Sequence, residues 1–377
     1  MRGQVKKRGN SWTVRVYGGL DPDSGKRRYI NRTVHGTKKE AEQVRVALLR
    51  QLDQGELLLT PTRLTLVEYL GEWLEKAARP RVRARTFDDY EGLLRRYVIP
   101  VLGEKRLSAL TPLDLQGVVS GMLGRGLAPR TVRYSHVVLR NALQQAVKWR
   151  LISHNPAQGV ELPKHEHVEM LAMSQEESQR FLAAAAASKH HLLFALLLAT
   201  GLRPGEAVAL RWSDFDVVGR SISVNRSASF TRRGLRLEPP KTRRSRRTVE
   251  LPEHLVGRLL DRRGDAAAEA YIFPSKVGTP LDPRNLAAKY FKPILAAAGL
   301  PRALRVYDLR HTHATLLLAA GVNPKIVSER HGHASVALTL DRYSHVLPGM
   351  QADSARKLDA MLFSSTPEPR ARGDLAN

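Results

Sequence analysis

Tyr343 is the side chain whose chemistry most needs an explanation. It lies in the stretch SERHGHASVALTLDRYSHV, after His331 and His333. A tyrosine on a helix usually packs in a core, so packing is the ordinary interpretation. A phenol has a pKa near ~10 and becomes a nucleophile only where its proton is drawn off and nearby cations favour the phenolate. The question is whether the chain brings such groups to Tyr343.

The stretch ATGLRPGEAVALRW places a cation at the predicted start of a helix. Pro204 suits the first helical position, with Arg203 just before it and Glu206 in the first turn. A guanidinium beside free backbone donors binds anionic oxygen well, and Glu206 could orient neighbouring cations. A surface arginine with an ordinary helix salt bridge explains the same residues, so both interpretations stay open.

The stretch EPPKTRRSRRTVEL places Lys241 after two prolines, at the predicted tip between two strands. A lysine on a rigid turn can be delivered into a cleft, where it could donate a proton. Most basic clusters only grip phosphate, and this one could do both. The arginines that follow Lys241 are predicted DNA contacts: Arg243, Arg244 and Arg246, with Arg247 beside them.

The stretch VYDLRHTHATLLLAAG predicts a helix with Asp308 as its N-cap, Arg310 in its first turn and Gly321 at its end. A metal would be one use for the nearby histidines, which are His311, His313, His331, His333 and His345. However, histidines two apart on a helix point to different sides. No cysteine or tight carboxylate cluster completes a ligand shell, so we predict neither a metal nor another cofactor.

Taken in order, these motifs resemble those of the tyrosine recombinases, the phage integrase family. The resemblance rests on TGLRPGE, PKT, DLRHT, GHAS and the final tyrosine, and it covers essentially the whole chain. It implies a catalytic set with supporting residues: Arg203, Lys241, Arg310, His333 and Tyr343, supported by Glu206, Asp308 and His311. One position departs from the family, because Tyr307 stands where relatives often have histidine.

The resemblance implies that Tyr343 attacks a DNA phosphodiester and forms a 3′-phosphotyrosine, which allows strands to be rejoined without ATP or metal. In-line attack adds negative charge to the nonbridging oxygens, and preorganised donors stabilise that charge. The two arginines and His333 can supply those donors. The resemblance assigns the protonation of the leaving 5′-oxygen to Lys241. Tyr307 could donate a hydrogen bond, but a phenol cannot act as a base near neutral pH.

The charge of the chain indicates a polyanionic partner. Its net charge is +25 and its pI is near 10.7, and nucleic acid is the commonest polyanion in a cell. A basic membrane-surface protein would need an amphipathic basic helix or a lipid anchor, and we find neither. The charged N-terminus predicts no signal peptide, and the longest apolar run, LLFALLLA, is too short to span a bilayer. We therefore expect a cytoplasmic, nucleoid-associated protein of a bacterial host cell.

The elements that would hold these residues fall into three segments. Residues 1–58 alternate in short strands before a helix, and the resemblance implies an arm-site DNA-binding domain. A solvated basic hairpin is the alternative interpretation. The predicted DNA contacts of this segment are Lys6, Lys7, Arg8, Arg15, Lys26, Arg27 and Arg28.

Residues 64–162 predict a helical bundle, which resembles the core-site DNA-binding domain, with Arg130 and Arg133 of its last helix facing phosphate. Residues 171–364 combine helices with a strand region, like the mixed α/β catalytic domain, and residues 365–377 have the composition of a disordered tail. The expected fold is therefore multidomain and mainly α with small β-sheets.

We interpret the sequence as a site-specific recombinase that integrates or excises a phage or mobile element at double-stranded DNA attachment sites. The family implies a homo-tetramer on DNA, with possible accessory DNA-bending and directionality proteins. The segment MQADSARKLDAMLF could pack against a neighbouring protomer or within its own chain. The alternatives are a tyrosine topoisomerase or transposase, and a non-catalytic DNA-binding repressor on a recombinase scaffold.

Overall fold

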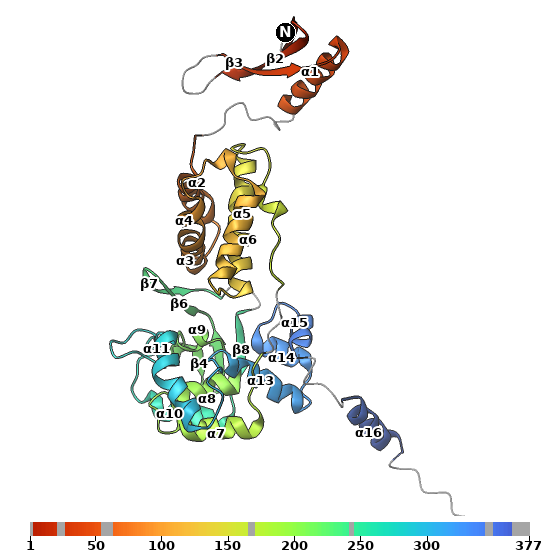
Figure 1. Cartoon of the computed structure of the whole chain (residues 1–377). Coiled ribbons are helices and arrows are strands. Elements are labelled where there is room, and N and C mark those ends of the chain that lie inside the picture. The colour runs from red at the N-terminus through yellow and green to blue at the C-terminus, as the bar shows by residue number, and fades with distance from the viewer. Residues whose placement is uncertain are drawn as a thin grey trace, which may run out of the picture. The chain divides into compact units, whose positions relative to one another are not determined.

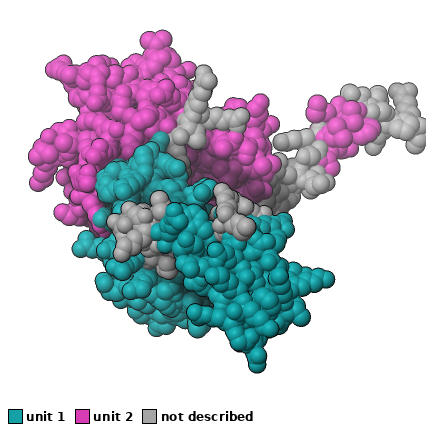
Figure 2. Space-filling view, turned by 90° about the horizontal axis from the view of Figure 1, so that it is seen from above, with its two compact units in different colours: residues 1–167 teal, residues 168–377 magenta. Residues whose placement is uncertain are grey.

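The structure is a computed structural model, and it describes residues 3–20, 27–53, 63–164, 170–240, 245–343 and 350–363 (Figure 1). The chain divides into two compact units, residues 1–167 and residues 168–377, which Figure 2 colours separately. The architecture is mainly helical with small antiparallel sheets, which confirms the predicted fold class. None of the helices in the described residues is long and apolar enough to cross a membrane.

The N-terminal part of the first unit is a three-stranded antiparallel sheet with one helix. Its strands are β1 (Gly3–Arg8), β2 (Ser11–Leu20) and β3 (Arg27–Val34), in the order β1-β2-β3, followed by α1 (Lys38–Asp53). Alternation along β2 buries Val14 and Val16, which pack with Ala41 and Leu48 of α1. The sheet therefore keeps one face for its core, and Arg15 on the other face of β2 stays exposed, as the alternation along the strand predicts.

The rest of the first unit is a helical bundle, as predicted. Its helices are α2 (Leu66–Trp73), α3 (Ala84–Leu93), α4 (Ile99–Leu102), α5 (Pro112–Gly124) and α6 (Pro129–Lys148), with π-helical turns η1 (Leu74–Ala78) and η2 (Leu94–Val98) and 3₁₀ turns η3 (Leu107–Ala109) and η4 (Pro156–Gly159). Thr65 and Thr111 begin α2 and α5 with capping boxes, which pair otherwise free backbone donors. Tyr69 and Leu143 are among the residues of its buried core.

The second unit begins with α7 (Gln175–Ala185), α8 (His191–Thr200) and the short helix α9 (Pro204–Ala207). Ser174 caps α7 together with Glu177 in a capping box, which pairs otherwise free backbone donors. After the 3₁₀ turn η5 (Trp212–Asp214), the strands β4 (Phe215–Asp216), β5 (Ser221–Val224) and β8 (Arg247–Glu250) form one antiparallel sheet, while β6 (Ser227–Thr231) and β7 (Gly234–Glu238) form a separate hairpin.

The helices that follow are α10 (Glu253–Arg263), α11 (Pro283–Leu286), η7 (Ala287–Phe291), α12 (Lys292–Ala297), α13 (Asp308–Ala319), α14 (Pro324–His331), α15 (Val336–Tyr343) and α16 (Met350–Phe363). The apolar helix α8 lies at the centre of this unit, where Leu193, Phe194 and Leu197 are fully buried. Helix α13 packs against α8, so the ends of α8 and α13 are held at fixed positions.

The prediction for Asp308 was wrong. Tyr307 occupies the N-cap position of α13, and Asp308 is the first helical residue. The Asp308 carboxylate instead accepts hydrogen bonds from the Arg305 backbone N–H at 2.8 Å and from the Arg305 guanidinium at 2.8 Å. The carboxylate therefore reaches back to the preceding turn, where a cation and a free backbone donor lie together, and does not cap its own helix.

Candidate active site

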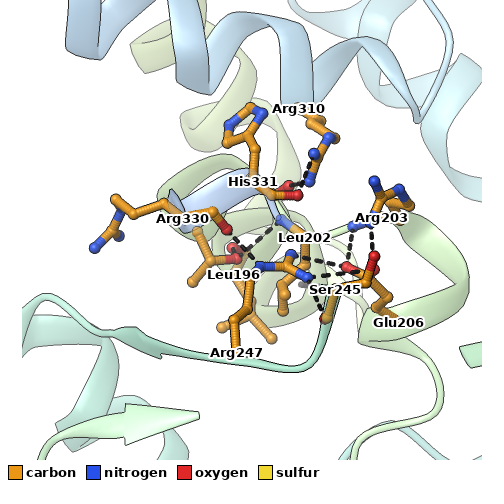
Figure 3. A network of polar contacts seen from close by, with 11 residues as sticks. Leu196, Leu202, Arg203, Glu206, Ser245, Arg247, Arg310, Arg330 and His331 are labelled. Carbon is orange, nitrogen blue, oxygen red and sulfur yellow. Dashed lines mark hydrogen bonds and ion pairs between the residues drawn. The ribbon is translucent and has the colours of Figure 1, made fainter. Parts of the chain in front are cut away.

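A buried carboxylate of α9, Glu206, joins two arginines (Figure 3). Glu206 Oε1 lies 2.7 Å from Arg203 Nη1, and Oε2 accepts the Arg203 backbone N–H at 3.0 Å. On the other side, Arg247 Nη2 of β8 lies 2.9 Å from Glu206 Oε2. Burial would raise the pKa of Glu206, but the charges and hydrogen bonds of Arg247 and Arg203 outweigh it and lower the pKa. Glu206 therefore stays ionised and orients both cations.

Arg247 also ties the sheet to α14. Its Nε donates to the Arg330 carbonyl at 2.6 Å, and its Nη1 donates to the Ser245 carbonyl at 3.1 Å (Figure 3). The side chain is 6% exposed, so these bonds and the ion pair with Glu206 lie inside the protein. Arg247 is therefore a positioning residue for Arg203, acting through Glu206.

Arg310 is a buried cation whose guanidinium is held by backbone carbonyls. Its guanidinium donates to the carbonyls of Gly201 and His331, each at 2.5 Å (Figure 3). Among the described residues, no carboxylate lies within ion-pair distance of it. Burial, with the charge of Arg203, lowers the pKa of Arg310 to about 9, so it stays charged at neutral pH. A buried charge of this kind favours the binding of an anion.

His333 is held by the hydroxyl of Thr339, which lies 2.7 Å from its Nδ1. When the hydroxyl donates to Nδ1, the ring proton lies on Nε2 and can be donated to a ligand. Burial, together with the charges of Arg310 and Arg203, lowers the pKa of His333 to about 3. His333 is therefore a neutral hydrogen-bond donor beside the two arginines.

His331 fills the space next to this donor. Its ring stacks on His313 with centroids 5.3 Å apart and meets His333 edge-on at 5.2 Å. Both of its nitrogens are buried and form no hydrogen bond with any described residue. Gly201, in the left-handed region at φ +64°, passes so close that an added Cβ would lie 2.5 Å from His331 Nε2. The three histidines thus pack against one another. The described parts of the chain contain no group of three histidine or carboxylate side chains that could bind a metal ion.

Tyr343 lies at the end of α15, where its ring is buried against Ala314, Leu318 and Val327. Its hydroxyl lies 2.7 Å from Nδ1 of His311, which comes from α13. Burial raises the pKa of Tyr343 to about 12 against the opposing charges of Arg310 and Arg342. Burial also lowers the pKa of His311 to about 4. The phenol is therefore both packed and hydrogen-bonded to a neutral imidazole.

The family model of the phage integrase family matches residues 162–349, and that of the phage integrase N-terminal SAM-like domain matches residues 65–123. The integrase of Mycobacterium phage L5 is 30% identical over 284 residues, which cover 74% of this chain and 74% of that protein. A tyrosine recombinase XerC-like protein of Caldanaerobacter subterraneus subsp. tengcongensis is 28% identical over 390 residues, covering 95% of this chain and 98% of that protein. The chain belongs to the phage integrase family.

The activity of this integrase is that of a tyrosine-type site-specific recombinase, as the sequence predicted. The solved structure of the Tn1549 transposon integrase in complex with a circular intermediate DNA is similar, with a TM-score of 0.67 and 23% identity. The similarity covers 78% of this chain and 99% of that chain, and it shows a shared fold.

The structure of the integrase brings together most of the predicted catalytic residues. The positive charge of Arg203 lowers the pKa of Arg310, and the charges of both arginines lower the pKa of His333. The charge of Arg310 also lowers the pKa of Tyr343, so these groups share one site. Tyr307 is half-buried, with its ring edge-on to His311 at 5.3 Å. Five residues that were considered from the sequence lie outside the described part of the chain: Lys241, Arg243, Arg244, Lys26 and His345.

The predicted DNA contacts of the integrase differ in their surroundings. The side chains that are exposed are Lys6, Lys7, Arg8, Arg15, Arg27, Arg130 and Arg246. Arg28 belongs to β3, and Arg133 donates to the Pro163 carbonyl at 3.0 Å. Arg15 also lies over the ring of Tyr29, with its guanidinium carbon 3.8 Å from the centroid. These seven cations are therefore accessible to solvent.

Sequence reasoning missed the positioning roles of Arg247 and Thr339. Arg247 stood in a basic run that predicted only contact with phosphate, and no local feature distinguished it from Arg246. Thr339 lies one helical turn before Tyr343 and has no motif of its own. Their roles depend on partners that other helices and strands bring to them.

Proposed function

We propose that this integrase cleaves DNA with Tyr343 as its nucleophile and integrates or excises a phage or mobile element. The observation that carries the proposal is a Tyr343 hydroxyl that is hydrogen-bonded to His311 and feels the charge of Arg310, a buried cation with no carboxylate partner among the described residues. A phosphodiester supplies the missing negative charge, and its nonbridging oxygens gain charge during in-line attack. Tyr343 then forms a 3′-phosphotyrosine, which preserves the bond energy for strand rejoining.

The other residues have distinct roles in this proposal. Arg203, Arg310 and His333 bind the nonbridging oxygens, and Tyr307 donates one further hydrogen bond. Lys241 protonates the leaving 5′-oxygen, a role that comes from the family resemblance. Glu206 orients Arg203, which its two hydrogen bonds to that residue support. Asp308 supports the start of α13, where Arg310 lies.

We further propose that residues 1–58 bind arm sites, residues 64–162 bind core sites and residues 171–364 carry the catalytic site. The double-stranded DNA of the attachment sites is the partner, and the net charge of +25 supports this. In β2, residues alternate, so Thr13 and Arg15 point away from the face that Val14 and Val16 bury. This outward face can approach DNA while α1 covers the other.

The proposed assembly is a homo-tetramer on DNA, with accessory DNA-bending and directionality proteins, in the cytoplasm of a bacterial host cell. Helix α16 supports the assembly, because Leu358, Met361, Leu362 and Phe363 are exposed by 56–81%. Within the described residues, these apolar side chains are not buried by their own chain, which favours packing against a neighbouring protomer. Residues 365–377, predicted as a disordered tail, lie outside the described residues.

A suicide substrate tests the nucleophile, because it traps the covalent protein–DNA adduct. Tyr343→Phe removes one oxygen and should abolish the adduct while DNA binding survives. Tyr290→Phe is the matched control, since Tyr290 lies in the same unit and packs edge-on against His190 at 4.4 Å. We expect the control to form the adduct as the wild type does. An adduct in Tyr343→Phe would overturn the proposal.

A further inference from the structure

We propose that His311 is the general base that takes the proton of Tyr343 during strand cleavage. The inference rests on the proposed function, in which Tyr343 is the nucleophile. It gives His311 a chemical role in the reaction, where the family resemblance implied only a supporting one. The imidazole touches the reacting oxygen, so the role is catalytic and not one of positioning.

The geometry places a proton acceptor directly on the nucleophile. His311 Nδ1 lies 2.7 Å from the Tyr343 hydroxyl oxygen, within the range for proton transfer between a base and the group it serves. The two residues come from α13 and α15, and both side chains are buried. Among the described residues, no other group forms a hydrogen bond with this hydroxyl.

A base is needed because the phenol does not ionise by itself near neutral pH. The pKa of Tyr343 is raised to about 12, mainly by burial. The pKa of His311 is lowered to about 4, mainly by burial, so its ring is neutral and can offer a lone pair. The negative charge of a bound phosphate beside the ring would raise its proton affinity, which brings it closer to the range of an effective base.

Among the described residues, the other candidates for this role are occupied. His333 directs its Nδ1 to Thr339, and Glu206 is bound between two arginines. Tyr307 is a phenol and cannot accept a proton near neutral pH. Of the side chains described around Tyr343, His311 is therefore the one placed to accept its proton.

The step balances in protons and electrons. The O–H bond of Tyr343 breaks, its proton moves to His311 Nδ1, and the oxygen forms a bond to phosphorus. The bond between phosphorus and the 5′-oxygen breaks, and that oxygen takes a proton from Lys241. The products are a 3′-phosphotyrosine, a 5′-hydroxyl, an imidazolium and the neutral amine of Lys241. When the strands are rejoined, the imidazolium returns its proton to Tyr343 and the attacking 5′-hydroxyl returns its proton to Lys241.

The test is single-turnover cleavage of a suicide substrate by His311→Asn between pH 5.5 and 9. Asparagine can keep a hydrogen bond to the hydroxyl but cannot take its proton. We expect a loss of about 10²–10⁴-fold near neutral pH. The cleavage rate of the variant should rise about tenfold per pH unit, because it depends on the fraction of free phenolate. The cleavage rate of the wild type should instead become constant once the His311 imidazole is neutral.

Other titratable or charged groups around the His311 ring also affect the pH profile of cleavage, so its assignment to His311 needs a control. They are Asp308, Arg305, Arg310, Arg342, Tyr307 and Tyr343. His313→Asn is the matched control, because His313 lies on the same helix and bonds to the Leu198 carbonyl. It should keep the wild-type shape of the pH profile. A fluorinated tyrosine of lower pKa at position 343 should restore much of the rate to His311→Asn.

The outcomes separate this inference from the proposed function. If His311→Asn cleaves at the wild-type rate with the wild-type pH profile, while Tyr343→Phe forms no adduct, the base assignment alone is wrong. If Tyr343→Phe still forms the adduct, the nucleophile assignment fails instead. Should His311→Asn not fold, nitrogen-15 NMR of the wild-type chain decides the matter. A His311 ring that carries its proton on Nδ1 at pH 7 would overturn the inference.

Discussion

Replacing Glu206 with glutamine should loosen the cation site, because the Glu206 carboxylate holds Arg203 and Arg247 together. The change preserves the shape of the side chain and removes one buried negative charge. Arg247 is 6% exposed, so its interaction with Glu206 is poorly screened by solvent. Arg203 is 34% exposed, and its ion pair contributes less for that reason. The loss of the Arg247 pair therefore determines the size of the effect.

The expected magnitude follows from the geometry of this pair. Breaking a buried ion pair costs about 3–5 kcal/mol, since one charge is left buried and unpaired. The amide oxygen of glutamine can still accept one hydrogen bond, which returns about 1 kcal/mol. We expect Glu206→Gln to lower the free energy of unfolding of the second unit by about 2–4 kcal/mol. Cleavage should slow by about 10–100-fold, as Arg203 loses its orientation.

Hydrogen exchange of the buried α8 amides measures the stability of this unit, and a suicide substrate measures cleavage. Glu329→Gln makes the same charge change at an exposed position and should alter neither by much. Since the pKa of Glu206 is lowered in the folded state, its contribution is present above its ordinary value of 4.5. The contribution is lost as the pH falls through the lowered pKa. Unchanged exchange and cleavage in Glu206→Gln at pH 7 would refute the reasoning.

Two further predictions concern other residues of the site. Tyr307→Phe should remove one hydrogen bond to a charged group, which is worth roughly 1.5–3 kcal/mol. The single-turnover cleavage rate should therefore fall by about one to two decades. A variant that cleaves as fast as the wild type would show that Tyr307 only packs. His331→Leu should stabilise the second unit by about 1–3 kcal/mol at pH 7, because it removes two buried nitrogens that have no partner in the described residues. Burial lowers the pKa of His331, so the wild type loses stability as the pH falls below about 6.5, by up to ~1.4 kcal/mol per pH unit for this residue. Urea unfolding at several pH values should show that the free energy of unfolding changes less with pH in the variant than in the wild type. An equal dependence on pH in the two proteins would contradict the assignment.

The sequence by itself determined the features that depend on neighbours a few residues apart. The capping box at Ser174 and Glu177 joins residues one helical turn apart, and the alternation that buries Val14 and Val16 needs only the period of a strand. The order of the motifs around Arg203 and Arg310 also stands in the sequence, and it was sufficient to indicate the family. Local geometry is the same in any fold, so these patterns can be interpreted without coordinates.

Only the tertiary structure decided which distant groups meet. His311 and Tyr343 are 32 residues apart, and Glu206 and Arg247 are 41 apart, so no periodicity links them. Burial, not residue type, made Tyr343 a phenol with a raised pKa and His311 a neutral acceptor.

The hydrogen-bond partners of Asp308 also depend on the tertiary structure, although they lie only three residues away in the sequence. Its spacing suited an N-cap, yet the nearby guanidinium and backbone N–H of Arg305 were better partners for its carboxylate. Several partners can satisfy one polar group, and the packing of the whole unit selects among them.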